Sequence, residues 1–274
     1  MVAPDLRIVR VLSNNAVLAR DHVDERVMVG KGIGFGRKPG DIVTVDPTHR
    51  QYIELSSDKA QYLELLGVID PRILETISAA IDFAVELLGE LHPSVYVVLA
   101  EHLSFAVERV GRGETIESSL LNEVRAVFPA EFNAAELIVS YINANLDDVS
   151  LPVDEAVYIA LHLKAARSGV TVKQPLATAN AVADLVSLVR KRLGLEPTDG
   201  LVLELTRLNK RIRSGRFRTN AAGRAIRREM FADYVLSEEI IRHILGASTL
   251  SRATEGEVAF LAVFLHGWRQ EQAL

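Results

Sequence analysis

The sequence contains no cysteine in its 274 residues. This absence excludes a disulfide-stapled scaffold, cysteine-ligated zinc, an iron–sulfur cluster and thiol catalysis. No uncharged apolar run reaches the ~18 residues that a bilayer span requires, and the most apolar segment is interrupted by Asp82 and Glu86. The N-terminus also lacks an apolar stretch that would serve as a signal peptide. We therefore expect a cytoplasmic protein without membrane insertion.

Excess positive charge is absent too, since 31 Lys and Arg stand against 36 Asp and Glu, a formal net charge of -5. A chain-wide polycation wrapped around nucleic acid is excluded, although a basic face on one domain is not. Hydrophobic residues make up 49% of the chain and charged residues 24%, which is a globular composition. At ~100–150 residues per domain, the length allows two or three compact units.

The pattern of apolar residues changes near residue 60. Before it, short β-branched runs alternate with Asn, Asp, Gly and Pro, which predicts an antiparallel meander. These runs are 8–12, 16–19, 21–25, 27–29, 42–45 and 52–55. After residue 60, apolar residues recur at three- and four-residue steps, which predicts helices. Glycines at 89, 111, 113 and 169 mark helix ends, and 170–177 is predicted as a linker.

An internal repeat organises the helical part. A shift of 102 residues aligns Arg109 with Arg211 and Glu155 with Glu257, and the same offset continues without gaps over most of both copies. Two copies of a helical domain follow from this repeat. The expected fold class is multidomain and mainly α, with a small antiparallel β-sheet domain over 1–60 and two homologous α-helical bundle domains over 64–171 and 172–274.

Four glycines fall within residues 30–36, with cations near both ends. A P-loop is disfavoured because Gly32 follows Lys31 where Ser or Thr is required, and a dinucleotide fingerprint fails on spacing. Two interpretations stay open. The segment is either a glycine-rich turn in which Phe35 plugs the core, or a nucleic-acid contact. In the second case cations meet phosphates and an exposed Phe35 stacks on a base.

The segment from Ile8 to Asn15, followed by Val29 to Phe35, resembles the co-antiterminator RNA-binding domain of the BglG, SacY and LicT family of transcriptional antiterminators. The two-copy helical body is similar to that family's paired regulation domains, called PRDs. This resemblance covers essentially the whole chain. It implies a symmetric homodimer of four-stranded sheets that grips an imperfect mRNA hairpin. The hairpin overlaps a terminator, so that holding it lets polymerase read through.

The resemblance also implies which residues act. The RNA-facing residues of the family correspond here to Arg10, Asn15, Gly30, Lys31 and Phe35. Ser13 stands where the family usually carries a third Asn, so the resemblance does not carry over one polar contact to RNA at this position.

Histidines at the positions of His102 and His162 accept phosphate from the sugar phosphotransferase system in this family. The resemblance implies that the sugar permease component phosphorylates the first copy when substrate is absent, which inhibits RNA binding. In the second copy, Glu204 and Phe264 stand where the family has histidines phosphorylated by the general carrier HPr. Either this copy is a degenerate structural copy, or Glu204 permanently supplies part of a phosphohistidine's charge.

Three functional hypotheses follow. The first is an RNA-binding antiterminator of a sugar-uptake operon switched by phosphorylation. The second is a PRD-type regulator that has lost phosphoryl input or RNA binding and responds to another signal. The third is an enzyme that uses His102 and His162 with Glu101 or Asp154 as general acid or base. Because the sequence has no nucleophile elbow, zinc-protease motif or phosphate loop, we expect no enzyme, metal or cofactor. The basic run 207–218 is either a DNA contact or a solvated helix end.

Overall fold

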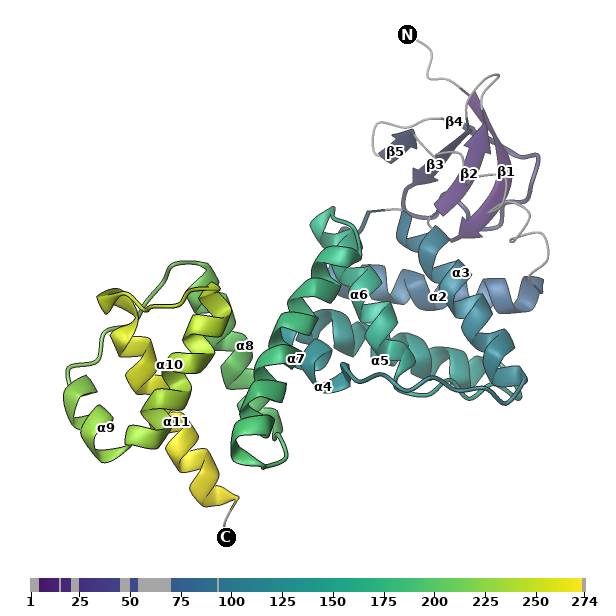
Figure 1. The fold of residues 1–274 in the computed structure, drawn as a ribbon. Helices are drawn as coiled ribbons and strands as arrows, with labels where there is room; N and C mark the ends of the chain where they lie inside the picture. The colour runs from purple at the N-terminus through teal and green to yellow at the C-terminus, as the bar shows by residue number, and fades with distance from the viewer. Residues whose placement is uncertain are drawn as a thin grey trace. The chain divides into compact units, whose positions relative to one another are not determined.

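The computed structural model describes residues 5–14, 16–20, 25–44, 50–53, 70–92 and 94–272. The chain divides into two compact units (Figure 1). The first unit is Met1–Ser119 with Phe128–Pro175, and the second is Leu120–Val127 with Leu176–Leu274. These limits differ from the predicted boundary between helical copies, because residues 120–127 lie in the second unit and residues 172–175 lie in the first.

A five-stranded sheet forms the N-terminal part of the first unit. Its strands are β1 (Asp5–Ser13), β2 (Ala16–Arg20), β3 (Glu25–Val29), β4 (Ile42–Thr44) and β5 (Arg50–Ile53). The strand order is β4-β1-β2-β3-β5, and every neighbouring pair is antiparallel. The antiparallel sheet is thus confirmed, but the predicted meander holds only for β1-β2-β3, because β4 pairs with β1 and β5 with β3. The sheet has five strands where the resemblance implied four. Residues 21–24, 45, 54 and 55 of the predicted runs lie outside the described residues.

The sheet packs a small core on one face. Register places Ile8 opposite Ala19 and Val17 opposite Met28, and alternate residues of a strand face the same side. The core comprises Leu6, Ile8, Val17, Ala19, Met28, Ile33 and Val43. Ile33 belongs to no strand, so the glycine-rich loop supplies part of the sheet's core.

Four helices complete the first unit, namely α2 (Pro71–Leu88), α3 (Ser94–Gly111), α5 (Pro129–Asn145) and α6 (Glu155–Ser168). Asp70 caps α2 by accepting a hydrogen bond from the Arg72 N–H at 2.8 Å, which satisfies one free donor of the first turn. Gly169 ends α6 in the left-handed conformation at φ 63. The helix ends predicted at residues 89, 111 and 169 are therefore confirmed.

The second unit contains α4 (Leu121–Val127), most of α7 (Lys173–Leu193), α8 (Asp199–Arg213), α9 (Gly223–Glu229), α10 (Phe231–Leu245), a 3-10 turn (Arg252–Thr254) and α11 (Glu255–Glu271). Helices α7, α8, α10 and α11 build its core, and Ala126 and Val127 of α4 pack against that core. No helix in the described ranges is long and apolar enough to cross a bilayer.

The helix starts reproduce the 102-residue repeat, since α2 and α7 begin at residues 71 and 173, α4 and α9 at 121 and 223, and α5 and α10 at 129 and 231. The predicted linker 170–177 is wrong beyond residue 172, because α7 begins at Lys173. Pro175 lies in the first turn of α7, where its missing N–H removes no helical hydrogen bond.

Candidate functional site

The glycine-rich loop after β3 presents Phe35 to solvent. The Ile33 N–H donates to the Gly30 carbonyl and the Phe35 N–H to the Gly32 carbonyl, both at 3.1 Å. Gly32 adopts φ 72, a conformation in which a side chain would be strained. Ile33 is 6% exposed and Phe35 is 75% exposed. The loop's hydrophobic plug is therefore Ile33, and the interpretation of Phe35 as the plug is wrong.

The loop is tied to the turn between β1 and β2, because the Gly34 N–H donates to the Asn14 carbonyl at 3.0 Å. Gly30, Lys31 and Phe35 thus lie together beside this turn, and Lys31 is exposed. An exposed cation next to an exposed aromatic ring suits an unpaired nucleotide, since the cation meets phosphate and the ring stacks on the base.

Of the other two predicted RNA-facing residues, the structure describes Arg10, which lines a pocket of about 410 Å³ together with Asn14, Gly34 and Gly36. Arg10 lies on β1 opposite Leu18 and is partly buried. Because Val17 and Ala19 face the sheet's core, Leu18 and Arg10 face the opposite side. Asn15 lies outside the described residues.

The first helical copy brings its two predicted histidines together. His102 on α3 and His162 on α6 have ring centroids 6.1 Å apart. Tyr158, one turn before His162, lies 5.8 Å from the His102 ring. His162 also lines an open pocket of about 430 Å³, which gives this ring a route to solvent.

A buried carboxylate organises this pair. Glu155, at the start of α6, is fully buried. Its Oε2 lies 3.1 Å from His102 Nε2, and its Oε1 accepts a hydrogen bond from the Arg109 guanidinium. Burial alone would raise the pKa of Glu155, but His102 and Arg109 outweigh it and hold that pKa below its ordinary value. Glu155 is therefore a carboxylate at neutral pH.

Burial and the nearby His102 lower the pKa of His162 to about 4. Its ring is neutral at physiological pH, and a neutral imidazole carries a nucleophilic lone pair.

The acid-base partners considered from the sequence are wrong. Glu101 is exposed, and Asp154 Oδ1 accepts a hydrogen bond from the Ser118 N–H at 2.7 Å. Glu155 contacts His102, and Arg109 contacts Glu155; the sequence prediction assigned neither residue to the site. The internal repeat could have indicated both residues, because the second copy has an identical Arg and Glu at the corresponding positions.

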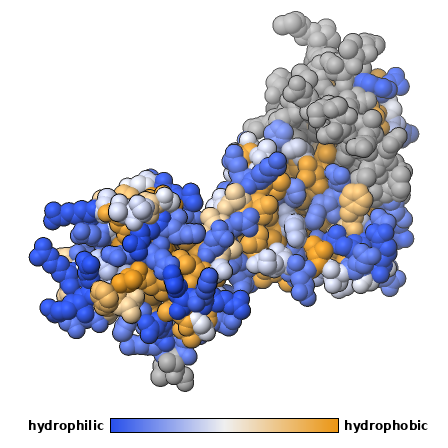
Figure 2. All heavy atoms as spheres, in the orientation of Figure 1, coloured by the Kyte–Doolittle hydropathy of each residue, from blue (hydrophilic) through white to orange (hydrophobic). Residues whose placement is uncertain are grey.

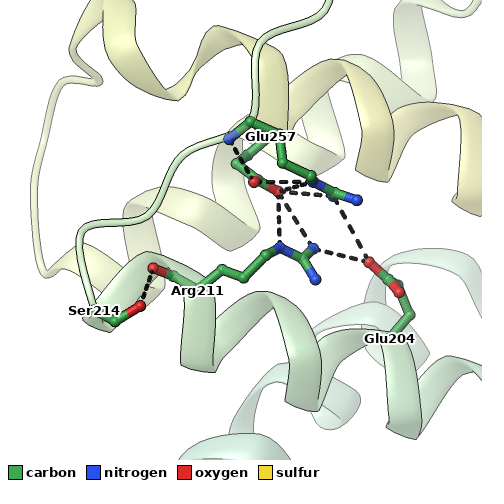
Figure 3. Close-up of polar contacts among 5 residues, drawn as sticks. Glu204, Arg211, Ser214 and Glu257 are labelled. Carbon is green, nitrogen blue, oxygen red and sulfur yellow. Dashed lines mark hydrogen bonds and ion pairs between the residues drawn. The ribbon is translucent and has the colours of Figure 1, made fainter.

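In the second copy the corresponding site is a network of charges (Figure 3). Glu257 is fully buried. Arg211 lies between two carboxylates, donating from Nη2 to Glu204 at 3.0 Å and to Glu257 at 3.3 Å. Glu204 thus occupies the position of His102 and reaches the repeat's own arginine. Phe264, at the position of His162, packs partly buried against the hydrophobic core.

A second arginine completes this network. Arg218 donates from Nη2 to Glu257 at 2.8 Å, donates its backbone N–H to the same carboxylate at 2.9 Å, and lies over the Phe260 ring at 4.3 Å. Burial acts to raise the pKa of Glu257, but the hydrogen bonds from Arg218 and Arg211 prevail and lower it. The repeat aligns Arg218 with Ile116, so the first copy has no such cation.

The loop that carries Arg218 fits only because residue 256 is glycine. A Cβ on Gly256 would lie 2.0 Å from the Arg218 carbonyl oxygen. The first copy has Asp154 at the corresponding position, and its carboxylate accepts a hydrogen bond from the Ser118 N–H of the corresponding loop. The second copy thus combines three differences, at 204, 218 and 256, that fit one another.

Comparison with known proteins extends these observations. The CAT RNA binding domain matches residues 6–61, and the PRD domain matches residues 80–166. One similar protein is the GlcA/glcB genes antiterminator of Staphylococcus carnosus (strain TM300). It is 28% identical over 174 residues, which cover 61% of this chain and 60% of that protein. Protein GlcT of Staphylococcus aureus (strain JH9) is 24% identical over 192 residues, covering 68% of this chain and 67% of that protein.

Among solved structures, the crystal structure of GlcT CAT-PRDI is 26% identical, covers 60% of this chain and 99% of that chain, and superposes with a TM-score of 0.47. An RNA-binding domain followed by a PRD domain defines the chain as an RNA-binding regulator and not an enzyme. The chain belongs to the BglG family of transcriptional antiterminators, as the resemblance implied.

Proposed function

We propose that this protein is an antiterminator of a sugar-uptake operon that binds, as a homodimer, to a nascent-mRNA hairpin overlapping a terminator. Phosphorylation of His102 and His162 by the sugar permease component of the phosphotransferase system inhibits this binding. The exposed Phe35 and Lys31 on a loop anchored to Asn14 support the RNA contact. A hairpin with internal loops offers the unpaired bases that such a loop recognises.

One observation carries the phosphorylation proposal. Among the described residues, Arg109 Nε is a buried donor that makes no hydrogen bond. A buried donor without an acceptor is costly, and in the second copy the corresponding Arg211 Nε donates to Glu257. A phosphoryl group on His102 supplies acceptor oxygens beside Arg109, which satisfies this donor by a charge-assisted hydrogen bond.

Glu155 prepares His102 for this reaction. An ionised carboxylate only accepts hydrogen bonds, so the His102 nitrogen that faces it, Nε2, carries the proton. In the neutral ring the lone pair then lies on Nδ1, which forms the bond to phosphorus as the donor's own bond to phosphorus breaks. The product adds ~1.5–2 negative charges next to Glu155. Phosphate and Glu155 then compete for Arg109, which rearranges the contact between α3 and α6.

Glu204 has the corresponding role in the second copy without any phosphate. It holds Arg211 by an ion pair at 3.0 Å, as a phosphoryl group on His102 would hold Arg109. A single carboxylate carries less charge than a phosphoryl group, so Glu204 is a partial and permanent substitute.

The RNA contact is tested by titrating the full chain against a panel of imperfect hairpins at two salt concentrations. We expect submicromolar binding that weakens with salt, and a loss of roughly 5- to 150-fold with Phe35→Ala because base stacking contributes ~1–3 kcal/mol. Ile42→Ala, which also truncates an exposed apolar residue of the head, is the control. A correctly folded dimer that binds no hairpin contradicts the proposal.

The phosphoryl input is tested by incubating the chain with a phosphotransferase mixture and measuring acid-labile phosphate. We expect incorporation that falls when His102 or His162 is replaced by Ala, and weaker hairpin binding by the phosphorylated protein. His243→Ala, which removes an exposed histidine of α10, is the matched control. Hairpin binding without any incorporation would indicate a regulator that responds to another signal.

A further inference from the structure

The two helical copies differ in charge at the same place in the fold. Residues 207–228 of the second copy contain nine Lys and Arg and no Asp or Glu. The corresponding residues 105–126 of the first copy contain three Lys and Arg and four Asp and Glu. The concentration of cations is therefore not a property of the repeat, and it calls for a reason specific to the second copy.

These nine cations lie along one continuous stretch, which we call the basic edge. It consists of the second half of α8, the loop 214–222 and α9, and its cations are Arg207, Lys210, Arg211, Arg213, Arg216, Arg218, Arg224, Arg227 and Arg228. Figure 1 shows the loop running from the end of α8 along the outside of the second unit to α9. Hydrophilic side chains cover this side of the unit (Figure 2).

Most of these cations are available to a ligand. Five of them are exposed and make no ion pair with any residue that the structure describes, namely Arg207, Lys210, Arg213, Arg216 and Arg224. Like charges held close together repel one another, and a bound polyanion relieves that repulsion. The basic edge thus has the electrostatic character of a polyanion-binding surface.

The buried network gives this surface a fixed frame. Arg211 and Arg218 are held by Glu204 and Glu257 beneath the loop. The loop is closed further by the Ala222 N–H, which donates to Asn220 Oδ1 at 2.9 Å. Arg216, the exposed cation of this loop, therefore projects from an anchored backbone, so that little ordering of the loop is needed when a ligand binds.

The chemistry of the basic edge favours RNA over an acidic protein. Eight of the nine cations are arginine, whose planar guanidinium binds phosphate in a bidentate manner and stacks on bases. Phe231, two residues after the end of α9, is 62% exposed. Arg227, on α9, lies over the Tyr234 ring at 5.6 Å. Arginines combined with an exposed aromatic ring are typical of surfaces that bind single-stranded nucleic acid.

We propose that the basic edge is a second RNA-contact surface, which binds the phosphates of single-stranded RNA flanking the hairpin held by the glycine-rich loop. The identity of the hairpin rests on the proposed function, whereas the surface itself rests on the charges, the exposed ring and the anchored loop of the second unit.

The test compares the full chain with the triple variant Lys210→Gln, Arg216→Gln, Arg224→Gln, which removes one exposed cation from each part of the basic edge. Binding of a hairpin with single-stranded flanks is measured over a range of salt. Each lost phosphate contact reduces the slope of log K against log salt by ~0.7 for a single strand. We expect a slope shallower by about 2 and affinity at least about tenfold weaker at low salt.

A second triple variant, Arg190→Gln, Lys191→Gln, Arg192→Gln, removes the same charge from the end of α7 and serves as the control. An unchanged slope in the basic-edge variant, or an equal loss in the control, overturns the inference. So does an equal effect of the basic-edge variant on duplex DNA or polyglutamate, which would indicate a surface for any polyanion. A change in self-association with RNA binding unchanged assigns the surface to contacts between copies and overturns it too.

The outcome for the proposed function is separate. If the full chain binds no hairpin, the same comparison is made with single-stranded RNA of mixed sequence, and a salt slope reduced only by the basic-edge variant upholds the second surface by itself. If Phe35→Ala abolishes hairpin binding while the basic-edge variant behaves as the intact chain does, the proposed function holds and the second surface does not.

Discussion

In the first helical copy a buried carboxylate contacts one histidine and one arginine, whereas in the second copy the carboxylate at the same repeat position contacts two arginines. The shared pair is Arg109 with Glu155 and Arg211 with Glu257. In the first copy the surrounding groups include a neutral imidazole and a donor without an acceptor. In the second copy each of the four charged groups of the network, Glu204, Arg211, Arg218 and Glu257, has a partner. The first site therefore has a free donor that can bind a new anion. In the second site the two carboxylates already neutralise the two arginines.

The difference also shows how the second copy balances charge where Glu204 and Phe264 stand in place of the two histidines. A buried charge needs a partner, so a carboxylate at 204 is compatible with the buried Glu257 only if positive charge is added. Arg218 supplies it, and Gly256 makes the space for its loop. Residues 204, 218 and 256 therefore form one charge-balanced arrangement at the position that the histidine pair occupies in the first copy.

The largest expected effect tests whether Glu257 and Glu155 contribute differently to the unfolding free energy of their units. Glu257→Ala leaves Arg211 and Arg218 without their buried partner, and breaking such a network costs ~3–5 kcal/mol of unfolding free energy. Glu155→Ala removes the buried partner of one arginine only, Arg109, so the loss of unfolding free energy should be smaller. Hydrogen exchange resolved to each unit measures both, because a chain of two units has no single unfolding transition. Equal losses would contradict the comparison.

An intermediate effect is expected from pH. The folded pKa of His162, about 4, lies below that of a free histidine, ~6.5. The unfolded chain therefore binds the proton first, and the first copy loses stability as pH falls from ~6.5 towards 4, by about 3 kcal/mol. Glu155 and Glu257, with lowered pKa values, contribute losses only below about 4.5.

His162→Phe, which copies Phe264, should remove this loss between pH 6.5 and 4.5. Hydrogen exchange resolved to each unit, in the intact chain and in the variant at both pH values, measures it. The second unit has no corresponding histidine and serves as the internal control. A stability difference between the two proteins that does not change with pH would show that His162 is not desolvated.

The smallest effect concerns Glu204. Glu204→Gln keeps the shape of the side chain but removes the charge that holds Arg211, and we expect a roughly tenfold loss of read-through, the equivalent of ~1.4 kcal/mol. Unfolding of the second unit should change little, because Glu204 is partly exposed and Glu257 retains both arginines. Glu238→Gln on α10 is the control. Unchanged read-through would make Glu204 a structural residue.

The sequence was informative wherever the signal was local or repeated. Helix starts follow the 102-residue offset, and the helix ends lie at the predicted glycines. The linker prediction failed because Pro175 suggests a break, although a proline in the first turn is compatible with a helix. Two positions were open for Phe35, because composition does not reveal which residue of a glycine-rich loop faces the core. The turns of the backbone place Ile33 in the core and Phe35 in solvent.

The histidine pair was predictable from the family motif, but the groups that tune it were not. Glu155 and Arg109 lie 46 positions apart, and only packing of α3 with α6 joins them. Their identity in both copies was visible in the sequence and was used to define the repeat, not the site. Asn15 lies outside the described residues, and its role stays a prediction.

The position of α4 has a consequence for the order of synthesis. This helix lies between two segments of the first unit, yet Ala126 and Val127 pack on the core of the second. Its main neighbour, α8, begins at Asp199, roughly 70 residues after α4 ends. At ~5–20 residues per second, a ribosome needs several seconds to supply it. The helices of the first unit can therefore pack together before α8, the packing partner of α4, has been synthesised. A chain whose synthesis stopped before α8 would leave α4 without this partner.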